Sequence, residues 1–153
     1  MRGRESGFTL VEIVCVLAIV ALLAALALPA IPHGTSTARL NAYALQAAAM
    51  LTADRNAAIA RREKIATLMD SQAKTMTAGA SRDVLRFPAD VAFDAIVAQN
   101  CAGRSAGTSI DFFASGMSCG GAIDLSRPGV GVQVRVNWLT GGVEVVAVEP
   151  EKN

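Results

Sequence analysis

The sequence predicts an α+β protein in which one long N-terminal helix precedes a domain built on an antiparallel β-sheet. An apolar run occupies the N-terminus, and an Ala-rich stretch at 36–62, free of Gly and Pro, continues the helix signal. Near the C-terminus, apolar and polar residues alternate over 132–138, which is typical of a strand with one buried face. The 153 residues suffice for one globular domain but not for two.

The apolar run is long enough to form a membrane helix. No charged residue occurs in 13–31, and the residues 8–11 in front add to its length. At about 1.5 Å per residue, a helix of roughly 24 residues would cross a hydrocarbon core of about 30 Å. Arg2 and Arg4 precede the run, so the positive-inside rule keeps the N-terminus in the cytoplasm and exports everything after Pro32.

Three kinds of segment fit this pattern: a cleaved secretory signal peptide, an uncleaved signal anchor, and a signal that is cut in front of the apolar run. The small residues of Ala25-Leu26-Ala27 keep the first kind open. Glu12 favours the third, because a carboxylate inside an apolar span costs about 2.5–3.5 kcal/mol and needs a partner. After a cut behind Gly7, the new α-amine of Phe8 can pair with the Glu12 carboxylate of a neighbouring subunit in a stack of parallel helices.

The segment Gly7-Phe8-Thr9-Leu10-Val11-Glu12 resembles the motif of type IV prepilins, Gly-Phe-Thr-Leu-x-Glu, and an apolar run follows it as in that family. The resemblance implies that a prepilin peptidase removes the leader 1–7 by cleavage after Gly7 and that Phe8 becomes N-methylated. It also implies that the helix is kept, with a transmembrane half at 8–32, and that Glu12 acts in assembly. We therefore expect a single-pass protein of the inner membrane whose C-terminal domain lies in the periplasm.

The second half of the predicted helix, 33–62, is amphipathic. Pro29 and Pro32 predict a kink or a loop between the two halves, because proline lacks an N–H donor and clashes with the preceding turn. Beyond them, small and apolar residues recur at helical spacing on one stripe, which Asp54 and Arg55 flank. We expect this stripe to pack against the exported domain; it consists of Leu40, Ala44, Ala47, Leu51 and Ala58.

The remainder of the chain, 63–153, predicts a β-rich exported domain. Its clearest strand has Val132, Val134, Val136 and Trp138 on the face that we expect to be buried. Thr140-Gly141-Gly142 supplies the glycines of a tight hairpin turn, whereas the polar stretch 71–81 is predicted to be a loop. The predicted strands span 64–70, 84–87, 91–97, 109–114, 122–125, 131–139 and 143–148.

A second resemblance narrows the family. Residues 109–116 and 120–125 resemble the pattern I-x-F-x-x-x-G … G-G-x-I-x-L of the GspH/FimT family of minor pseudopilins and minor pilins, and 136–143 resemble its closing hairpin. Where many relatives have Pro-Asp or Pro-Asn before the glycine, this chain has Ala114-Ser115. The resemblance implies a pilin-like fold, in which the long N-terminal helix packs on a C-terminal antiparallel sheet.

Two functions occur in that family. The resemblance favours a minor pseudopilin near the tip of a type II secretion pseudopilus, which supports export of folded proteins across the outer membrane. Its implied partners are other pseudopilins, the prepilin peptidase and secreted substrates. The alternative is a minor type IV pilin of the FimT type, involved in pilus assembly or DNA uptake.

The distribution of charged residues bears on whether the protein binds DNA, as the alternative function would require. DNA binding requires clustered Arg or Lys side chains on one face. Glu63 interrupts the only basic cluster, 61–64, and the tail 149–153 is net acidic. Without the leader 1–7 the chain is close to neutral. DNA is therefore not expected as a partner.

The three cysteines divide between the two parts of the chain. Cys15 lies in the apolar run, whereas Cys101 and Cys119 lie in the exported half, either as a disulfide or as two free thiols. The oxidising compartment favours the disulfide, which would stabilise the fold by roughly 3 kcal/mol in the chain-entropy model.

Catalytic and metal-binding patterns are absent from the sequence. His33 is the only histidine, and no P-loop, GxGxxG or CxxC motif occurs, so we expect neither an enzyme nor a cofactor. Asp90, Asp94, Asp111 and Asp124 do not have the spacing of a calcium loop, and we expect no metal.

Overall fold

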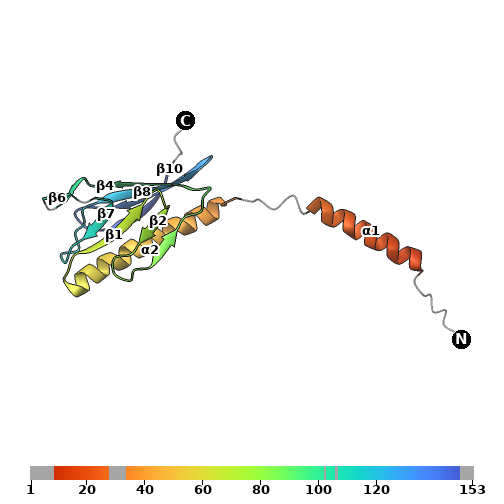
Figure 1. Ribbon diagram of the computed structural model, residues 1–153, viewed down its shortest axis with the longest axis horizontal. Coiled ribbons are helices and arrows are strands. Elements are labelled where there is room, and N and C mark those ends of the chain that lie inside the picture. The colour runs from red at the N-terminus through yellow and green to blue at the C-terminus, as the bar shows by residue number, and fades with distance from the viewer. Residues whose placement is uncertain (1–8, 28–33, 102, 106, 149–153) are drawn as a thin grey trace. The chain divides into compact units, whose positions relative to one another are not determined.

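The computed structural model describes residues 9–27, 34–101, 103–105 and 107–148. It divides at Gly34–Thr35 into two compact units, each of which is described here by itself. The first unit contains one helix, α1 (Leu10–Ala27). The second contains the helix α2 (Thr37–Arg61) followed by short strands (Figure 1). The predicted kink or loop at Pro29 and Pro32 lies outside the described residues.

Capping residues define both ends of α2. Ser36 has an extended backbone, and its hydroxyl accepts a hydrogen bond from the Arg39 N–H at 3.2 Å, as an N-cap residue does. At the other end Arg62 adopts a left-handed conformation with φ 54°, and the Glu63 N–H donates to the carbonyl of Ala58 at 3.2 Å. These caps satisfy backbone groups that the helix itself leaves unpaired.

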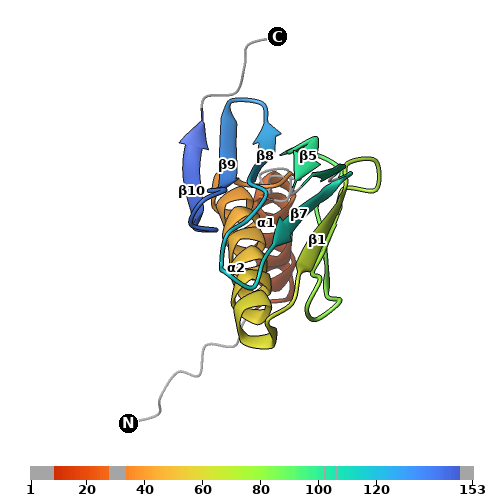
Figure 2. The ribbon, with the colours of Figure 1, turned by 90° about the vertical axis from the view of Figure 1, so that its left-hand side faces the viewer.

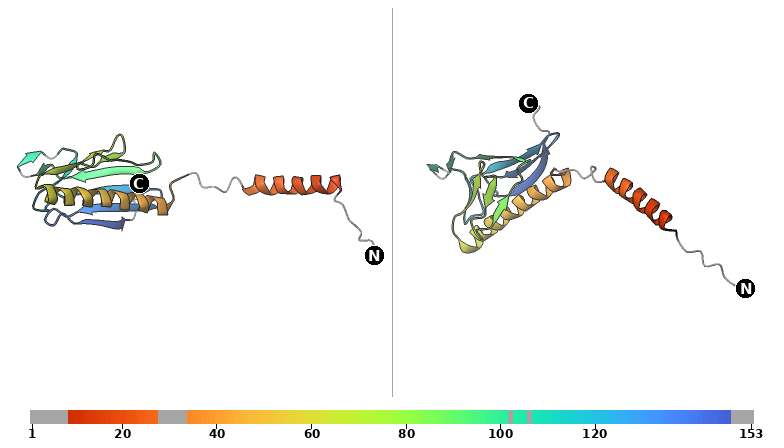
Figure 3. Two further views of the ribbon diagram at one scale, coloured as in Figure 1. Left: turned by 90° about the horizontal axis from the view of Figure 1, so that it is seen from below. Right: turned by 45° about the vertical axis from the view of Figure 1, so that its right-hand side comes forward.

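Two four-stranded antiparallel sheets make up most of the second unit. The first sheet has the order β3-β2-β1-β7 and the second the order β10-β9-β8-β4; β5 and β6 form a separate ribbon. Both sheets contact α2, and the left view of Figure 3 shows this helix between the green strands of the first sheet and the blue strands of the second. The strands are β1 (Ile65–Asp70), β2 (Thr75–Thr77), β3 (Val84–Arg86), β4 (Ala92–Val97), β5 (Asn100–Cys101), β6 (Arg104–Ser105), β7 (Ser109–Phe112), β8 (Gly121–Arg127), β9 (Val130–Val136) and β10 (Val143–Val148).

The core lies between α2 and the inner faces of the two sheets (Figure 2). All five residues of the predicted stripe on α2 are completely buried, which confirms the prediction from helical spacing. Val132, Val134 and Val136 of β9 face this core as predicted. The register of β9 with β10 pairs Val136 with Val143 and Val134 with Val145, so the predicted C-terminal hairpin is also confirmed.

Three expectations are wrong. The predicted loop 71–81 contains β2, because Met76 is fully buried and anchors a strand between β1 and β3. Trp138 is 61% exposed instead of buried, since β9 ends at Val136 and the pleat no longer continues. Asp54 does not flank the buried stripe of α2 but belongs to it, with 1% of its surface exposed.

Asp54 is accommodated in the core by three hydrogen bonds. Its Oδ2 accepts from the Thr67 hydroxyl at 2.7 Å and from the Gly79 N–H at 2.8 Å, while its Oδ1 accepts from the Ala80 N–H at 2.9 Å. A buried carboxylate without such donors would be strongly destabilising. The network therefore ties the middle of α2 to β1 and to the turn that follows β2.

Candidate functional site

The first turn of α1 contains the predicted assembly residue Glu12. The Glu12 N–H donates to Thr9, at 3.3 Å to the hydroxyl and at 3.1 Å to the carbonyl. Thr9 is therefore the N-cap, and Thr9-x-x-Glu12 has the spacing of a capping box. A carboxylate in the first turn also interacts favourably with the helix dipole. Glu12 thus lies in the first turn of a capped helix, and the Thr-x-x-Glu spacing is the sequence signal that sequence reasoning missed.

The surface of α1 is apolar on every side. Its large side chains are between about half and four-fifths exposed, and apart from Glu12 none of its residues is charged. A helix that is hydrophobic all round is normally buried in lipid or among other helices. Among the described residues, no helix combines the length and the hydropathy that spanning a bilayer requires. The exposed side chains are Leu10, Val11, Ile13, Val14, Val16, Leu17, Ile19, Val20, Leu22 and Leu23.

The predicted processing site cannot be placed beside Glu12, since Gly7 and Phe8 lie outside the described residues. Glu12 belongs to the first unit and the cysteines Cys101 and Cys119 to the second. Glu12 is therefore described with the first unit, and the two cysteines are described with the second. They belong to separate features, a helix start and a cross-link.

Cys101 and Cys119 form the disulfide that was one of the two alternatives for these residues. Their Cα atoms are 5.5 Å apart, and Cys15 is a free, exposed thiol on α1. The bond joins Cys101, at the end of β5, to Cys119, in the segment that precedes β8. The backbone N–H of Cys119 also donates to the carbonyl of Asp111 in β7 at 3.0 Å. The disulfide thereby attaches the β5–β6 ribbon to the edge strand β7.

Within the described part of the chain, no three His, Cys, Asp or Glu side chains come close enough to hold a metal ion. The four aspartates considered from the sequence each have a protein donor. Asp111 pairs with the Lys64 ammonium at 2.8 Å, Asp124 accepts from Gln133 at 2.5 Å, and Asp94 accepts from the Ala95 N–H at 2.8 Å.

The fourth aspartate, Asp90, bonds Thr35, the residue in front of the N-cap of α2. Its carboxylate accepts from the Thr35 N–H at 2.6 Å and from the Thr35 hydroxyl at 3.0 Å. The Arg127 guanidinium at the end of β8 donates to the Thr35 carbonyl. The hydrogen bonds from the Thr35 backbone and side chain lower the pKa of the Asp90 carboxyl below its ordinary value.

Arg55 fixes the loops at the other end of α2. Its Nε donates to the carbonyl of Gly116 at 3.0 Å and to the carbonyl of Thr140 at 3.1 Å. It thus links α2 to the 113–118 loop and to the β9–β10 turn. Gly141 lies against this junction with φ 63°, where a Cβ atom would come 2.1 Å from the Gly116 carbonyl oxygen.

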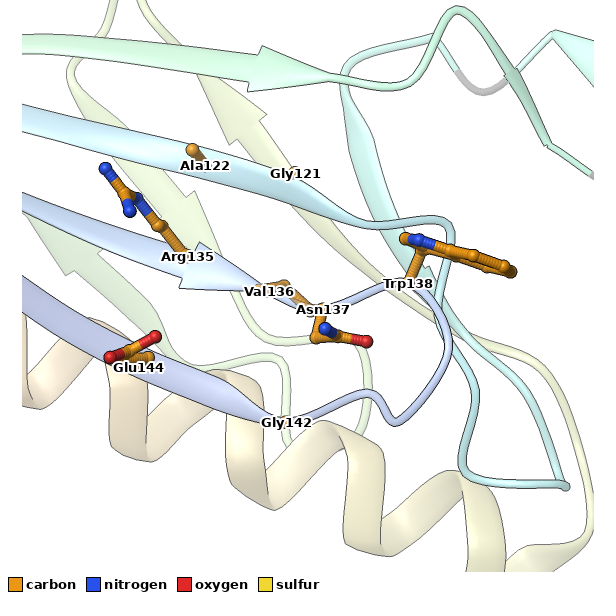
Figure 4. Close-up of a pocket in the computed structure, with 8 residues that line it drawn as sticks. All are labelled: Gly121, Ala122, Arg135, Val136, Asn137, Trp138, Gly142 and Glu144. Atoms are coloured by element: carbon orange, nitrogen blue, oxygen red, sulfur yellow. The ribbon is translucent and has the colours of Figure 1, made fainter.

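A pocket of about 380 Å³ lies on the outer side of the second sheet, beside the β9–β10 turn. The Trp138 ring projects past the end of β9, whereas Arg135 and Glu144 lie farther along the strands (Figure 4). Sequence reasoning placed Trp138 in the core and so missed this pocket. Its lining residues are Gly121, Ala122, Arg135, Val136, Asn137, Trp138, Gly142 and Glu144.

Comparison with known sequences gives two matches. Residues 2–28 match the family described as the prokaryotic N-terminal methylation motif. Over 144 residues the chain is 33% identical to type II secretion system protein H of Xanthomonas campestris pv. campestris. This alignment covers 94% of the chain and 84% of the relative.

Two solved structures share the fold. The minor pseudopilin EpsH from the type 2 secretion system of Vibrio cholerae superposes with a TM-score of 0.54 at 12% identity, covering 68% of this chain and 93% of that one. The type IV minor pilin FimU of Pseudomonas aeruginosa gives a TM-score of 0.51 at 20% identity, covering 71% of this chain and 92% of that one. At these identities the likeness concerns the pilin-like fold alone.

Proposed function

This chain belongs to the family of type II secretion system protein H, and we propose that it is a structural subunit of a type II secretion pseudopilus. In this role it supports the export of folded proteins across the outer membrane and is not an enzyme. The observation that carries the proposal is the 33% identity to the Xanthomonas protein over 94% of the chain, helix and exported domain together. The position near the filament tip is part of the proposal.

The mechanism is assembly through α1. A prepilin peptidase cuts after Gly7 and leaves Phe8 as the new, N-methylated terminus. The helix is then held in the inner membrane as a single span, with the second unit in the periplasm, until it moves into the filament. There the apolar surface of α1 packs among the helices of other pseudopilins, which covers side chains that are exposed in the single chain.

Glu12 sets the register of this packing. Its carboxylate meets the α-amine of a neighbouring subunit, so that two charges at membrane depth become one ion pair. Thr9 bonds the backbone of Glu12 and not its carboxylate in the described structure, so the Glu12 side chain has no recorded partner among the described residues. This supports a partner on another chain.

The alternative function, a minor type IV pilin of the FimT type that acts in DNA uptake, receives less support. Within the basic cluster, Arg61 lies 3.8 Å from the Glu63 carboxylate and Lys64 lies 2.8 Å from that of Asp111. Two of the three cations of this cluster are thus already paired with acids, and Arg62 alone is too little for a phosphate-binding face, which would need several free cations.

Complementation tests the proposal. In a strain that lacks the corresponding gene, the wild-type chain should restore secretion of a folded exoprotein, and Glu12→Gln should not. Gln is accepted at the third position of a capping box, so this variant keeps the cap and loses only the charge. Thr9→Ala is the matched control, because it removes the capping hydroxyl and keeps the carboxylate. Normal secretion by Glu12→Gln would contradict the register mechanism.

The N-terminus of the mature protein tests processing separately. Mass spectrometry of the chain from cells with the prepilin peptidase should give N-methylated Phe8 as the first residue. Cells without the peptidase should retain residues 1–7. A mature chain that begins beyond Ala27 would mean that the apolar segment is removed as an ordinary signal peptide.

A further inference from the structure

Four large apolar side chains lie exposed where α2 ends. Trp138 is 61% exposed, Leu139 55%, Ile59 41% and Met117 37%. They come from the β9–β10 turn, from α2 and from the 113–118 loop, three segments that Arg55 links through its bonds to Gly116 and Thr140. We call these four residues the apolar cap. The three segments adjoin one another, since a Cβ atom on Gly116 would come 3.2 Å from the Ile59 side chain and the Ser118 N–H donates to the Trp138 carbonyl at 3.0 Å.

The backbone beneath the apolar cap is rigidly held. The Asn137 side-chain oxygen accepts from the N–H groups of Leu139 and Thr140 at 2.9 and 3.0 Å. The Ser118 N–H donates to the carbonyl of Trp138 at 3.0 Å, which joins the loop to the turn. An exposed tryptophan on a fixed backbone loses little conformational freedom on binding, and such residues are enriched at the centres of interfaces.

Hydrogen-bond donors surround the pocket beside Trp138. The indole N–H of Trp138 and the amide N–H₂ of Asn137 have no hydrogen-bond partner among the described residues. Arg135 contributes its guanidinium, whose Nε donates to Gln133, and Gln133 in turn donates to Asp124 at 2.5 Å. The pocket therefore presents several donors, with Glu144 as its only carboxylate. This arrangement suits an incoming acceptor such as a carboxylate.

Two cations border the apolar cap on α2. Arg55 precedes Ile59 by four residues and therefore lies on the same face of the helix. Arg62 follows the last residue of α2, and its N–H donates to the Ile59 carbonyl at 3.3 Å. The guanidinium of Arg62 forms no hydrogen bond or ion pair with any described residue. Glu63, the acid nearest in sequence, is already 3.8 Å from Arg61. The border of the cap is thus cationic, and its complement is an acidic surface.

We propose that the apolar cap and the pocket beside Trp138 form a docking site for the globular domain of a neighbouring pilin-like subunit, which presents an acidic side chain next to an apolar one. The apolar group covers Trp138 and Leu139, and the acidic group faces Arg62 and the pocket donors. The identity of the partner rests on the proposed function, whereas the site rests on the contacts described above. A nucleic acid fits less well, because two border cations are too few for its phosphates.

Binding of the purified full chain in detergent to each pilin-like subunit of the same secretion system tests the site. Trp138→Ala should weaken binding to one of them by about tenfold or more, as expected for a central aromatic residue. Leu68→Ala is the matched control, since Leu68 is 55% exposed on β1 and lies outside the cap. Equal affinities of wild type and Trp138→Ala for every subunit, or no binding at all, would overturn the proposal.

Charge reversal tests the acidic character of the partner. Arg62→Glu should weaken binding by roughly threefold to tenfold, with a smaller effect at high salt. Arg82→Glu is a close control, because Arg82 is also exposed, has no side-chain partner among the described residues and has a positive φ of 67°. Equal losses in both variants, or preferential binding of a single-stranded oligonucleotide to the wild-type chain, would argue against an acidic protein partner.

A spectroscopic measurement locates the contact directly. Trp138 is the only tryptophan, so 5-fluorotryptophan in this chain gives a single ¹⁹F resonance. This resonance should shift when the unlabelled partner subunit is added. An unshifted resonance in a complex, from a chain that still restores secretion, would refute the docking site and leave the proposed function intact. Failure of the wild-type chain to restore secretion would count against the function itself.

Discussion

Asp90 holds Thr35 by two hydrogen bonds, from the Thr35 N–H at 2.6 Å and from the Thr35 hydroxyl at 3.0 Å. Thr35 is the first residue of the second unit, and Arg127 donates to its carbonyl. The point at which α2 enters the domain is therefore bonded to the turn before β4 and to the end of β8. We therefore expect a mechanical force that is transmitted along the chain from the residues before Thr35 to act first on the hydrogen bonds of Thr35 with Asp90 and Arg127.

The Asp90 contacts predict a pH dependence of stability. Because they lower the pKa of the carboxyl below 3.8, Asp90 stabilises the folded state above its unfolded pKa, and this stabilisation is lost as the pH falls through the folded pKa. Between about pH 5 and about pH 2, the free energy of unfolding should therefore fall more steeply for wild type than for Asp90→Asn. Urea denaturation followed by circular dichroism measures this. Parallel pH profiles would show that Asp90 contributes nothing.

Removal of the Asp54 carboxylate should lower the free energy of unfolding substantially. Asp54→Ala leaves the Thr67 hydroxyl and the Gly79 and Ala80 N–H groups without their acceptor, which should cost about 3 kcal/mol or more. Thr67→Val removes a single bond to the same carboxylate and should cost about 1 kcal/mol. Urea denaturation of both variants provides the comparison. A cost for Asp54→Ala no greater than that of Thr67→Val would mean that the network does not stabilise the core.

The sequence predicts best those elements whose signal is periodic and local. The stripe of α2 and the alternation of β9 follow from spacing alone, because each residue type repeats where the geometry of the element requires it. β2 could not be found in this way, since it has only 3 residues and Met76 is its only large apolar residue, so the sequence shows no alternation there. The same holds for Asp54, whose burial depends on donors supplied by residues 67, 79 and 80.

The candidate sites also differ in whether their signal is local in the sequence. The motif around Glu12 and the Cys101–Cys119 pair were found from the sequence, because short motifs and compartment chemistry carry their signal. The apolar cap was not found, since it brings together Ile59, Met117 and Trp138 from three segments. The alternation of β9 wrongly predicted that Trp138 is buried, because the pattern continues to Trp138 in the sequence whereas the strand ends at Val136.

The disulfide predicts equal effects of its two single substitutions. Cys101→Ser and Cys119→Ser should each lower the free energy of unfolding by about 3 kcal/mol, and the double variant should lose no more, because one cross-link is lost in every case. Cys15→Ser is the control, since Cys15 is a free thiol in the other unit. Thermal or urea denaturation under oxidising conditions measures the change. An additive loss in the double variant would indicate that the thiols act separately.

Gly141 and Gly129 provide a test of the junction beneath the apolar cap. Both have a positive φ, 63° and 83°, so a substitution to Ala should cost each about 1 kcal/mol from backbone conformation alone. A Cβ atom at Gly129 would meet nothing within 4 Å, whereas at Gly141 it would lie 2.1 Å from the Gly116 carbonyl oxygen and 2.7 Å from the Arg55 Nε.

Gly141→Ala should therefore destabilise the domain by clearly more than Gly129→Ala, by roughly 2 kcal/mol or more in addition. It should also disturb the bonds of Arg55 to Gly116 and Thr140, which hold the loop and the turn together. Urea denaturation measures the first effect, and the ¹⁹F resonance of labelled Trp138 reports the second. If both variants lose the same stability and leave that resonance unchanged, the close approach of Gly141 to Gly116 does not constrain this end of the domain.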